Sequence, residues 1–540
     1  MDIMRDVEVE EAFVSVKREL GSRGCGNGIG FALAKRLSTE GFLVFAGCRD
    51  SKCKGAKELS RLKNIRVLQM DVSRDEEVED AFATIDRELG LNALWSVVAN
   101  AGVRTDGLLE WHTMDSIVKI FNVNVFGTLR VIKKFLPMLK RSKGRVIVMN
   151  SPLGHVTIPM EVPYCMTKHA LVSMVDGFRR ECQGKGVDFI NMEPSAYKTQ
   201  ITANFGDPDL VEQDLLRQPP DVRADYSTEA VQRWLQFPKI LFDIINRDNL
   251  DEVVDPIVLA IREADPDTCY VSPWRLGAKE LSQLKNIRVL QLDVTRDEEV
   301  EEAFSIVKRE LGSRVLWSVV ANAGVRNDGL LEWMTMDSII KVFNVNVFGT
   351  LRVTKKFLPM LKKSKGRMIV ISSPFGHFTM PLGVAYCMTK HALVSMVDGL
   401  RRECRGKGVD FINIEPAAYK TRMTANLGDP GLVQQDWQQQ SAEVTAHYSK
   451  AEIRRWSRLP RLIYDIIERE NLEEVVDQIM LAIRETDPKT CYISPWLFGN
   501  FMSHVPRILP TELADLAIGT IVTRVPFVLR LAGYGAKKSK

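Results

Sequence analysis

Hydrophobic and polar residues follow two recurring patterns along the chain. Short apolar runs, bounded by polar residues or glycine, lie at 42–46, 65–70, 94–99, 146–149 and 187–192. Runs of this length are typical of buried strands. Segments with apolar residues three or four positions apart lie at 31–40, 73–89, 114–140 and 164–178. That spacing is typical of helices with one buried face, so the chain predicts an α/β fold with a doubly wound parallel sheet.

The pattern occurs twice. Residues 55–274 match residues 277–496 at a constant offset of 222 positions, without a gap. A repeated unit of this length is the size of a domain. The sequence therefore predicts two tandem copies of the fold and not a solenoid of short repeats.

The edges of the repeat are irregular. Residues 9–23 resemble residues 300–314, which carry a helical pattern, so residues 1–23 are interpreted as a stray helix fragment of another copy. A glycine-rich turn starts at Gly24 with no apolar strand before it, and the second copy has no glycine-rich stretch. Both copies are thus predicted to be N-terminally incomplete. The expected parts are 1–23, a first domain at 24–274, a second at 275–496 and an apolar, basic-ended tail at 497–540.

Composition argues against several classes of function. The net charge is +4 in 540 residues and no basic tract stands out, so no nucleic-acid partner is expected. The nine cysteines are scattered without the spacing of a metal site. We therefore expect reduced thiols, no metal and a reducing compartment. The acidic N-terminus predicts neither a signal peptide nor a membrane span.

Three side chains carry the candidate chemistry. Ser151 follows the run at 146–149, Tyr164 lies thirteen residues later, and Lys168 lies four residues after Tyr164. One helical turn puts the phenol and the ammonium on the same face. The ammonium charge lowers the pKa of the tyrosine from about 10, so the phenol can exchange a proton near neutral pH. The second copy repeats the set as Ser373, Tyr386 and Lys390.

Other candidates lie where predicted strands end, the edge at which parallel α/β sheets bind ligands. The turn from Gly24 to Gly30 lets backbone approach a pyrophosphate at a helix N-terminus, although a structural glycine turn is as good an interpretation. Arg49 can pair with a ribose 2′-phosphate and favours NADP(H), unless it is simply solvated. Asn124 is polar in an apolar helix, so it either ties a water to Lys168 or bonds to backbone.

Together these residues resemble the short-chain dehydrogenase/reductase family. The family's glycine motif, NNAG motif, helix asparagine, Ser-Tyr-Lys set and Pro-Gly element occur in order, as 23–30, 99–102, Asn124, Ser151 with Tyr164 and Lys168, and 194–195. Several segments resemble the branch of 17β-hydroxysteroid, retinol and 3-hydroxybutyrate dehydrogenases. The resemblance implies a Rossmann-like fold and an NAD(P)-dependent oxidoreductase. It implies interconversion of an alcohol and a carbonyl on an apolar, steroid- or retinoid-type substrate.

The resemblance also implies residue roles. Tyr164 is the acid/base, Ser151 orients the substrate oxygen, and Lys168 lowers the tyrosine pKa and holds the nicotinamide ribose. The implied catalytic residues are Asn124, Ser151, Tyr164, Lys168, Asn346, Ser373, Tyr386 and Lys390. The implied residues for NAD(H) or NADP(H) are Gly24, Gly28, Ile29, Gly30, Arg49, Asp71 (adenine), Asn100, Gly102, Tyr164, Lys168 and Thr199 (nicotinamide end).

The chain also departs from the family pattern. Arg23, Ala99 and Ser195 replace the family's Thr, first Asn and Gly. The second copy lacks the glycine-rich loop and the first two strands, so we expect it not to bind a dinucleotide in the usual way. An alternative is therefore a catalytically impaired tandem dehydrogenase that acts as a binding or scaffold protein. A further alternative is a joined gene model of neighbouring dehydrogenase genes, with joins at Arg23 and near Trp274.

Two segments bear on substrate and location. Residues 205–265 occupy the position of the family's substrate lid and carry Pro, Trp and Leu, so a bulky apolar substrate is expected. The apolar run 513–534 either lies on a membrane surface or packs on the second domain. The last four residues resemble a dilysine retrieval signal, so the expected location is the endoplasmic reticulum membrane or the cytoplasm. The two units are expected to pack on each other or to form a homo-oligomer.

Overall fold

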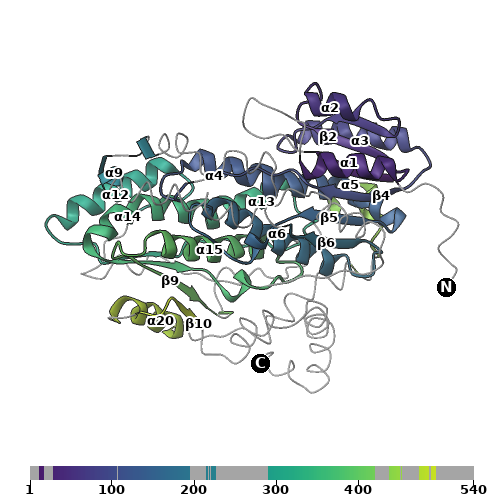
Figure 1. Cartoon of the computed structure of the whole chain (residues 1–540). Coiled ribbons are helices and arrows are strands. Elements are labelled where there is room, and N and C mark those ends of the chain that lie inside the picture. The colour runs from purple at the N-terminus through teal and green to yellow at the C-terminus, as the bar shows by residue number, and fades with distance from the viewer. Residues whose placement is uncertain are drawn as a thin grey trace, which may run out of the picture. The chain divides into compact units, whose positions relative to one another are not determined.

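The chain folds into two compact units. The computed structural model describes residues 11–16, 28–105, 107–194, 215–216, 218, 220–224, 226, 290–416, 418–419, 437–449, 452, 473–485 and 488–493. The first unit comprises Met1–Val156 with Pro163–Thr268, and the second comprises Thr157–Val162 with Cys269–Lys540. Figure 1 labels their helices and strands.

The first unit is built on a six-stranded sheet. Its strands are β1 (Glu11–Val16), β2 (Leu43–Cys48), β3 (Ile65–Gln69), β4 (Leu94–Ala99), β5 (Arg145–Met149) and β6 (Asp188–Met192). The strands are parallel and lie in the order β3-β2-β1-β4-β5-β6. The order runs outward in both directions from β1 and β4, so the sheet is doubly wound, as predicted. Its switch point, where ligands of such sheets bind, lies between these two strands.

Helices cover both faces of this sheet. They are α1 (Ile29–Thr39), α2 (Lys54–Leu59), α3 (Asp75–Leu89), α4 (Met114–Phe121), α5 (Thr128–Ser142), α6 (Val162–Glu181) and the short α9 (Pro220–Ala224). Because parallel crossovers are right-handed, the reversal of strand order puts α1 and α2 on one face and α3, α5 and α6 on the other. Leu33 and Leu37 of α1 pack on Val44 of the sheet. Across the other layer, Phe82 of α3 meets Phe135 of α5 edge to face.

The strand β1 shows that the predicted helix fragment at residues 1–23 is wrong. β1 pairs in parallel with both β2 and β4, so the first unit does have its first strand and does not start at residue 24. The nearly identical segment of the second unit lies in α12 (Asp297–Leu311). The local sequence is compatible with both structures. In the first unit the facing backbone groups of β2 and β4 require a strand, and this pairing overrides the helical pattern.

The predicted long helix at 114–140 is interrupted. Between α4 and α5 lies a π-helical turn, η1 (Asn122–Gly127). Such turns insert one extra residue into a helix and are frequent at functional sites. Gly127 ends this turn against the loop after β3, where an added Cβ would lie 2.5 Å from Val72 Cγ2, so only glycine fits.

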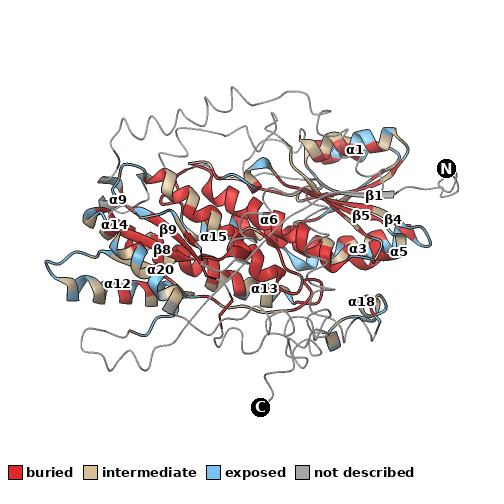
Figure 2. Cartoon of the chain, turned by 90° about the horizontal axis from the view of Figure 1, so that it is seen from below, coloured by how far each residue is buried: buried red, intermediate tan, exposed pale blue. Residues whose placement is uncertain are grey.

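The second unit has a four-stranded sheet within the described residues. Its parallel strands β7 (Ser318–Ala321), β8 (Arg367–Ile371), β9 (Asp410–Glu415) and β10 (Cys491–Ile493) lie in the order β10-β9-β8-β7. Its helices are α12, α13 (Met336–Phe343), the π-helical η4 (Asn344–Gly349), α14 (Thr350–Ser364), α15 (Val384–Glu403), α18 (Ala442–Thr445) and α20 (Glu473–Arg484). Figure 2 shows α6 and α15 buried over most of their length. The repeat aligns β7, β8 and β9 with β4, β5 and β6 of the first unit.

Several expectations concern residues outside this description. Gly24, Thr199, most of the predicted lid and the whole tail at 497–540 lie outside the described residues. Among the segments that the structure does describe, no helix is long and apolar enough to cross a membrane. In the same segments, no group of three His, Cys, Asp or Glu side chains is arranged to hold a metal ion, and the seven described cysteines are not joined in disulfide bonds.

Candidate active site

Tyr164 and Lys168 lie one turn apart on α6, as the spacing predicts. The Lys168 Nζ lies 5.4 Å from the centroid of the Tyr164 ring. Both side chains are buried. Lys168 Nζ donates a hydrogen bond of 2.7 Å to the carbonyl oxygen of Met149, the last residue of β5. The ammonium is therefore fixed between the end of the strand and the phenol ring.

Ser151 follows β5 and begins the 3-10 turn η2 (Pro152–Gly154). Its Oγ accepts a hydrogen bond of 3.2 Å from the Leu153 N–H. The Ser151 hydroxyl therefore lies at the same strand end as the carbonyl that holds Lys168. The three candidate catalytic side chains of the first unit come from two adjacent elements, the end of β5 and the first turns of α6.

Asn124 lies in the π-helical turn and is wholly buried. Its Oδ1 accepts from the Val103 N–H at 2.6 Å, and its Nδ2 donates to the Val103 carbonyl at 2.8 Å and to Thr167 Oγ1 at 3.0 Å. The side chain thus bonds to backbone, which was one of the two interpretations of the sequence. These bonds tie the loop after β4 to α6. Gly102 in that loop lies so close that an added Cβ would be 3.5 Å from Asn124 Oδ1.

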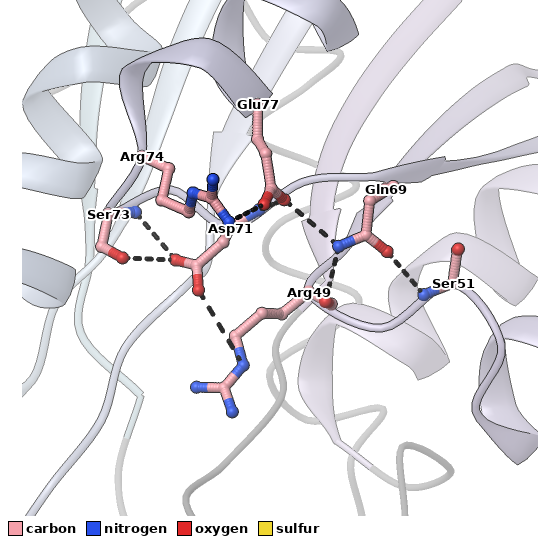
Figure 3. Close-up of polar contacts among 7 residues, drawn as sticks. All are labelled: Arg49, Ser51, Gln69, Asp71, Ser73, Arg74 and Glu77. Carbon is pink, nitrogen blue, oxygen red and sulfur yellow. Dashed lines mark hydrogen bonds and ion pairs between the residues drawn. The ribbon is translucent and has the colours of Figure 1, made fainter.

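Arg49 and Asp71 meet at the ends of β2 and β3, as Figure 3 shows. Arg49 Nε lies 4.0 Å from Asp71 Oδ2. The other carboxylate oxygen of Asp71 accepts from the N–H and the hydroxyl of Ser73, at 2.9 and 2.6 Å. The guanidinium is one-third exposed, so a cation is available at the strand edge beyond α1.

Gln69 and Glu77 organise the same edge, and the sequence did not single them out. Gln69 Nε2 donates to the Arg49 carbonyl at 2.8 Å and to Glu77 Oε2 at 3.2 Å, and its Oε1 accepts from the Ser51 N–H at 3.1 Å. Glu77 Oε2 also accepts from the Asp71 N–H at 2.8 Å. Figure 3 shows Gln69 bridging the loop that carries Arg49 to the start of α3.

The N-terminus of α1 suits a phosphate group. Ile29 and Gly30 open the helix after Gly28, no side chain caps it, and no acidic residue lies in its first turn. Uncapped N–H groups and the helix dipole favour an anion there. With the Arg49 cation at the neighbouring strand end, these residues fit the diphosphate and a phosphorylated ribose of a dinucleotide. Asn100, which directly follows β4, lies on the edge between this end and Ser151.

The second unit repeats the hydrogen-bonded frame. Asn346 Oδ1 accepts from the Val325 N–H at 2.7 Å, and its Nδ2 donates to the Val325 carbonyl at 2.9 Å and to Thr389 Oγ1 at 3.0 Å. Lys390 Nζ donates to the Ile371 carbonyl at 2.8 Å. Burial lowers the pKa of Lys390 to about 7.

The surroundings of Tyr386 differ from those of Tyr164. Tyr386 and Ser373 are wholly buried. The Phe375 ring lies edge-on to Tyr386, with 6.5 Å between centroids, and Phe378 packs on Phe375. The Ser373 Oγ is buried with no hydrogen-bond partner among the described residues. The positions of these two phenylalanines hold Leu153 and Val156 in the first unit.

Each candidate tyrosine faces an arginine that the sequence did not single out. The Arg104 guanidinium lies 5.9 Å from the Tyr164 ring centroid, and that of Arg326 lies 5.4 Å from the Tyr386 ring centroid. Arg326 forms a buried ion pair with Asp328, whose Oδ1 lies 2.5 Å from Arg326 Nε. Burial raises the pKa of Asp328, against the attraction of Arg326. No local pattern in the sequence pointed to Arg104 or Arg326, because a single arginine after a strand is usually solvated.

Parts of the predicted lid dock beside α4. Tyr226 donates a hydrogen bond of 2.5 Å to Glu110 Oε2, and its ring meets Trp111 edge to face. Gln218 Nε2 donates to the Trp111 carbonyl. Trp111 is wholly buried and Tyr226 is 8% exposed, so these contacts fix part of the predicted lid against the segment before α4.

Comparison with known proteins identifies the family. A family model described as short chain dehydrogenase matches residues 23–209 and 271–430. The chain belongs to the short-chain dehydrogenase family. This membership, the doubly wound sheet and the anion-suited helix α1 agree, and they make the protein an NAD(P)(H)-dependent oxidoreductase that acts on CH–OH groups.

Among curated relatives, three enzymes of Mus musculus mark the branch. The mitochondrial D-beta-hydroxybutyrate dehydrogenase is 35% identical over 257 residues, which cover 46% of this chain and 69% of the relative. Estradiol 17-beta-dehydrogenase 2 is 35% identical over 260 residues, covering 47% of this chain and 67% of the relative. Retinol dehydrogenase 7 is 30% identical over 259 residues, covering 46% and 81%. The predicted branch is therefore confirmed.

Proposed function

We propose that the first unit interconverts an alcohol and a carbonyl on an apolar substrate by acid/base catalysis at Tyr164. The observation that carries this proposal is the placement of Tyr164, Lys168 and Ser151 at the end of β5, in the unit that also holds α1 and the Arg49 edge. When bound there, the nicotinamide supplies or accepts the hydride. The chain's own residues bind the substrate oxygen and move the proton.

Each residue has one task in this proposal. The Ser151 hydroxyl holds the substrate oxygen beside the Tyr164 hydroxyl. Tyr164 donates its proton to that oxygen when a carbonyl is reduced, and accepts the proton when an alcohol is oxidised. The positive charge of Lys168, held 5.4 Å from the ring centroid, stabilises the phenolate. Asn124 keeps α6 and the loop after β4 in register through its bonds to Val103 and Thr167.

The proposed substrate class follows from the relatives. The names of the three relatives refer to hydroxybutyrate, estradiol and retinol. We favour an apolar substrate of steroid or retinoid size, since two of these three names refer to a steroid and a retinoid alcohol.

A matched pair of variants tests the proposal. NAD(P)-linked oxidation of estradiol, retinol and D-beta-hydroxybutyrate is measured for the native chain, Tyr164→Phe and Tyr386→Phe. Loss of an acid/base group typically lowers the rate by about 10²–10⁴-fold, so we expect this loss in Tyr164→Phe and native turnover in Tyr386→Phe. The reverse result would assign catalysis to the second unit.

A second proposal concerns the second unit, which we infer to be catalytically silent. Its tyrosine and serine are wholly buried under Phe375 and Phe378, and its sequence lacks the glycine-rich segment. On this proposal the second unit acts as a folded partner or scaffold. Titration of Tyr164→Phe with NADPH tests it, because a second dinucleotide bound per chain would contradict it.

A further inference from the structure

A histidine outside the implied catalytic set lies on the turn that carries Ser151. His155 directly follows η2, and its N–H donates to the Pro152 carbonyl at 3.0 Å. Its ring Nε2 lies 2.7 Å from Glu193 Oε1. The two residues are 38 positions apart in the sequence, but they follow the neighbouring strands β5 and β6. The pairing of these strands therefore brings the imidazole to the carboxylate.

Glu193 is itself held in place. Asn191 Nδ2 donates to the same Oε1 at 2.5 Å. The Asn150 N–H donates to the Met192 carbonyl at 2.7 Å, so β5 and β6 stay paired up to the residue before Ser151. Glu193 also precedes the Pro194 segment, which the family resemblance places at the nicotinamide end. The His155–Glu193 contact therefore joins the Ser151 turn to the start of that segment.

The charges around His155 favour its protonated form. Glu193 faces it from the end of β6, and Asp176 faces it from α6, where Asp176 pairs with Arg179 and Arg180. The hydrogen bond that the imidazole donates to Glu193 raises the pKa of His155 above its usual 6.5, burial acts against this shift, and attraction to Glu193 and Asp176 adds to it. The His155 side chain is 50% exposed, so it exchanges its proton with water.

We propose that His155 is a positioning residue: when protonated it pairs with Glu193 and holds the Ser151 hydroxyl in place for the substrate oxygen. This inference rests on the proposed function of the first unit. A group whose pKa is raised on folding contributes its stabilisation below its unfolded pKa and loses it as the pH rises through its folded pKa. The stabilisation of the Ser151 turn by the ion pair of His155 with Glu193 is therefore complete in mild acid, and it decreases as the pH rises above 6.5.

The second unit carries the same contact and supplies a matched control. His377 Nε2 lies 2.7 Å from Glu415 Oε1, with side chains only 10% and 2% exposed. Since Tyr386 is not the proposed acid/base, His377→Gln removes an equivalent pair without touching the proposed active site.

The experiment compares the full-length native chain with His155→Gln, Glu193→Gln and His377→Gln. Values of kcat/KM are measured across the range in which histidine titrates, with whichever of estradiol, retinol or D-beta-hydroxybutyrate the native chain oxidises. The ratio of native to His155→Gln kcat/KM isolates the contribution of the pair. Because the His155 side chain is 50% exposed, water screens this pair, and we assign it the value of an ordinary hydrogen bond, roughly 3- to 10-fold. We expect a ratio of that size in mild acid. It should fall toward unity as the pH rises, and His377→Gln should follow the native profile.

A spectroscopic readout identifies the titrating group. The chain has seven histidines, and NMR of ¹³C-labelled histidine side chains gives one titration curve for each. The signal missing from His155→Gln is assigned to His155, and we expect its pKa to fall in Glu193→Gln. If His155→Gln does not fold, the pH profile of Glu193→Gln takes its place.

The outcomes separate the two proposals. Turnover with a ratio that does not change with pH overturns the role of His155 alone. An equal loss in His377→Gln does so too, because the effect would then act through the fold. Absence of turnover by the native chain with all three alcohols overturns the proposed function, and this inference with it.

Discussion

The two candidate sites share one hydrogen-bonded frame and differ in what surrounds it. Asn124 and Asn346 accept from a valine N–H at 2.6 and 2.7 Å, and each donates to a threonine hydroxyl at 3.0 Å. Lys168 and Lys390 reach the last carbonyl of their strands at 2.7 and 2.8 Å. This frame needs only the segment from β4 to β6, which both units carry. The frame thus forms without α1 and the Arg49 edge, which only the first unit carries among the described residues.

The two sites differ in the residues of the turn that precedes the tyrosine helix. Val156 is 54% exposed, whereas Phe378 at the same repeat position is 2% exposed. Two larger rings, Phe375 and Phe378, stand where the first unit has Leu153 and Val156. The comparison teaches that the same hydrogen-bonded frame forms whether the residues beside the candidate tyrosine are Leu153 and Val156 or Phe375 and Phe378.

Removing the buried ammonium of the second unit gives the largest expected change in stability. Because the pKa of Lys390 is lowered from 10.5 to about 7, the unfolded chain holds a proton between these values that the folded chain lacks. Stability therefore rises with pH through this window. The pKa shift corresponds to a cost of roughly 5 kcal/mol for burying the charged ammonium. Replacing Lys390 removes this cost but also removes the hydrogen bond to Ile371, which is worth about 1 kcal/mol.

We therefore expect Lys390→Met to raise the free energy of unfolding by several kcal/mol below pH 7, with the gain fading toward pH 10.5. Urea unfolding at several pH values measures it. A gain that is the same at every pH would show that the buried charge is not its source.

The shared frame predicts matched losses from asparagine removal. Asn124→Ala and Asn346→Ala each leave a valine N–H and carbonyl unpaired, at the buried Val103 and at the partly buried Val325. Since each unpaired group is worth about 1–3 kcal/mol, we expect each variant to lose about 3 kcal/mol of stability in urea unfolding. Turnover should fall in Asn124→Ala alone. Loss of turnover in Asn346→Ala would contradict the division of roles between the units.

Opening the second site sharpens the comparison further. The double variant Phe375→Leu with Phe378→Val gives the second unit the residues of the first. Smaller core side chains should lower its stability by about 2 kcal/mol and make Tyr386 reactive to tetranitromethane, located by mass spectrometry. Leu153→Phe is the reciprocal control and should protect Tyr164. An unreactive Tyr386 in the double variant would mean that other residues cover it.

The smallest effect is expected at the Arg49 edge. Gln69→Met removes the bonds to the Arg49 carbonyl and the Ser51 N–H, so the guanidinium is less well oriented toward a 2′-phosphate. We expect NADPH to bind roughly 3- to 10-fold more weakly, the value of one hydrogen bond, with little change for NADH. Calorimetry measures both affinities. Gln291→Met changes the equivalent residue of the second unit, and an equal loss there would refute the assignment.

The local sequence patterns correctly predicted the features that depend on local interactions. The helical spacing of α6 placed Tyr164 and Lys168 on one face, and the apolar run at 146–149 placed Ser151 at a strand end. The break at Asn122 was missed because residues 117–126 are mostly apolar, which hides the one extra residue that a π-helical turn inserts. The pattern also predicted a helix from residue 73, but α3 begins at Asp75 and the Ser73 hydroxyl bonds to Asp71.

Long-range contacts were beyond such patterns. His155 and Glu193 share no spacing that marks a pair. The repeat is the signal that could have pointed to this pair. The second unit has His377 and Glu415 at the positions of His155 and Glu193, although several neighbouring residues differ between the units. The prediction of a helix at 9–23 was wrong for a related reason. The similar segment in α12 is helical, and only the pairing of β1 with β2 and β4 makes residues 11–16 a strand.

The place of β1 also orders the assembly of the first unit during synthesis. β1 leaves the ribosome first, yet it pairs with β4 at Leu94–Ala99 as well as with β2. No other described strand joins the β2–β3 half of the sheet to the β4–β6 half. Its six residues must therefore wait, with a sequence that is helical elsewhere in the same chain, until the later strands have emerged. Sheet closure is thus a late, non-local step, and the edge of β1 that pairs with β4 stays unpaired until β4 has emerged.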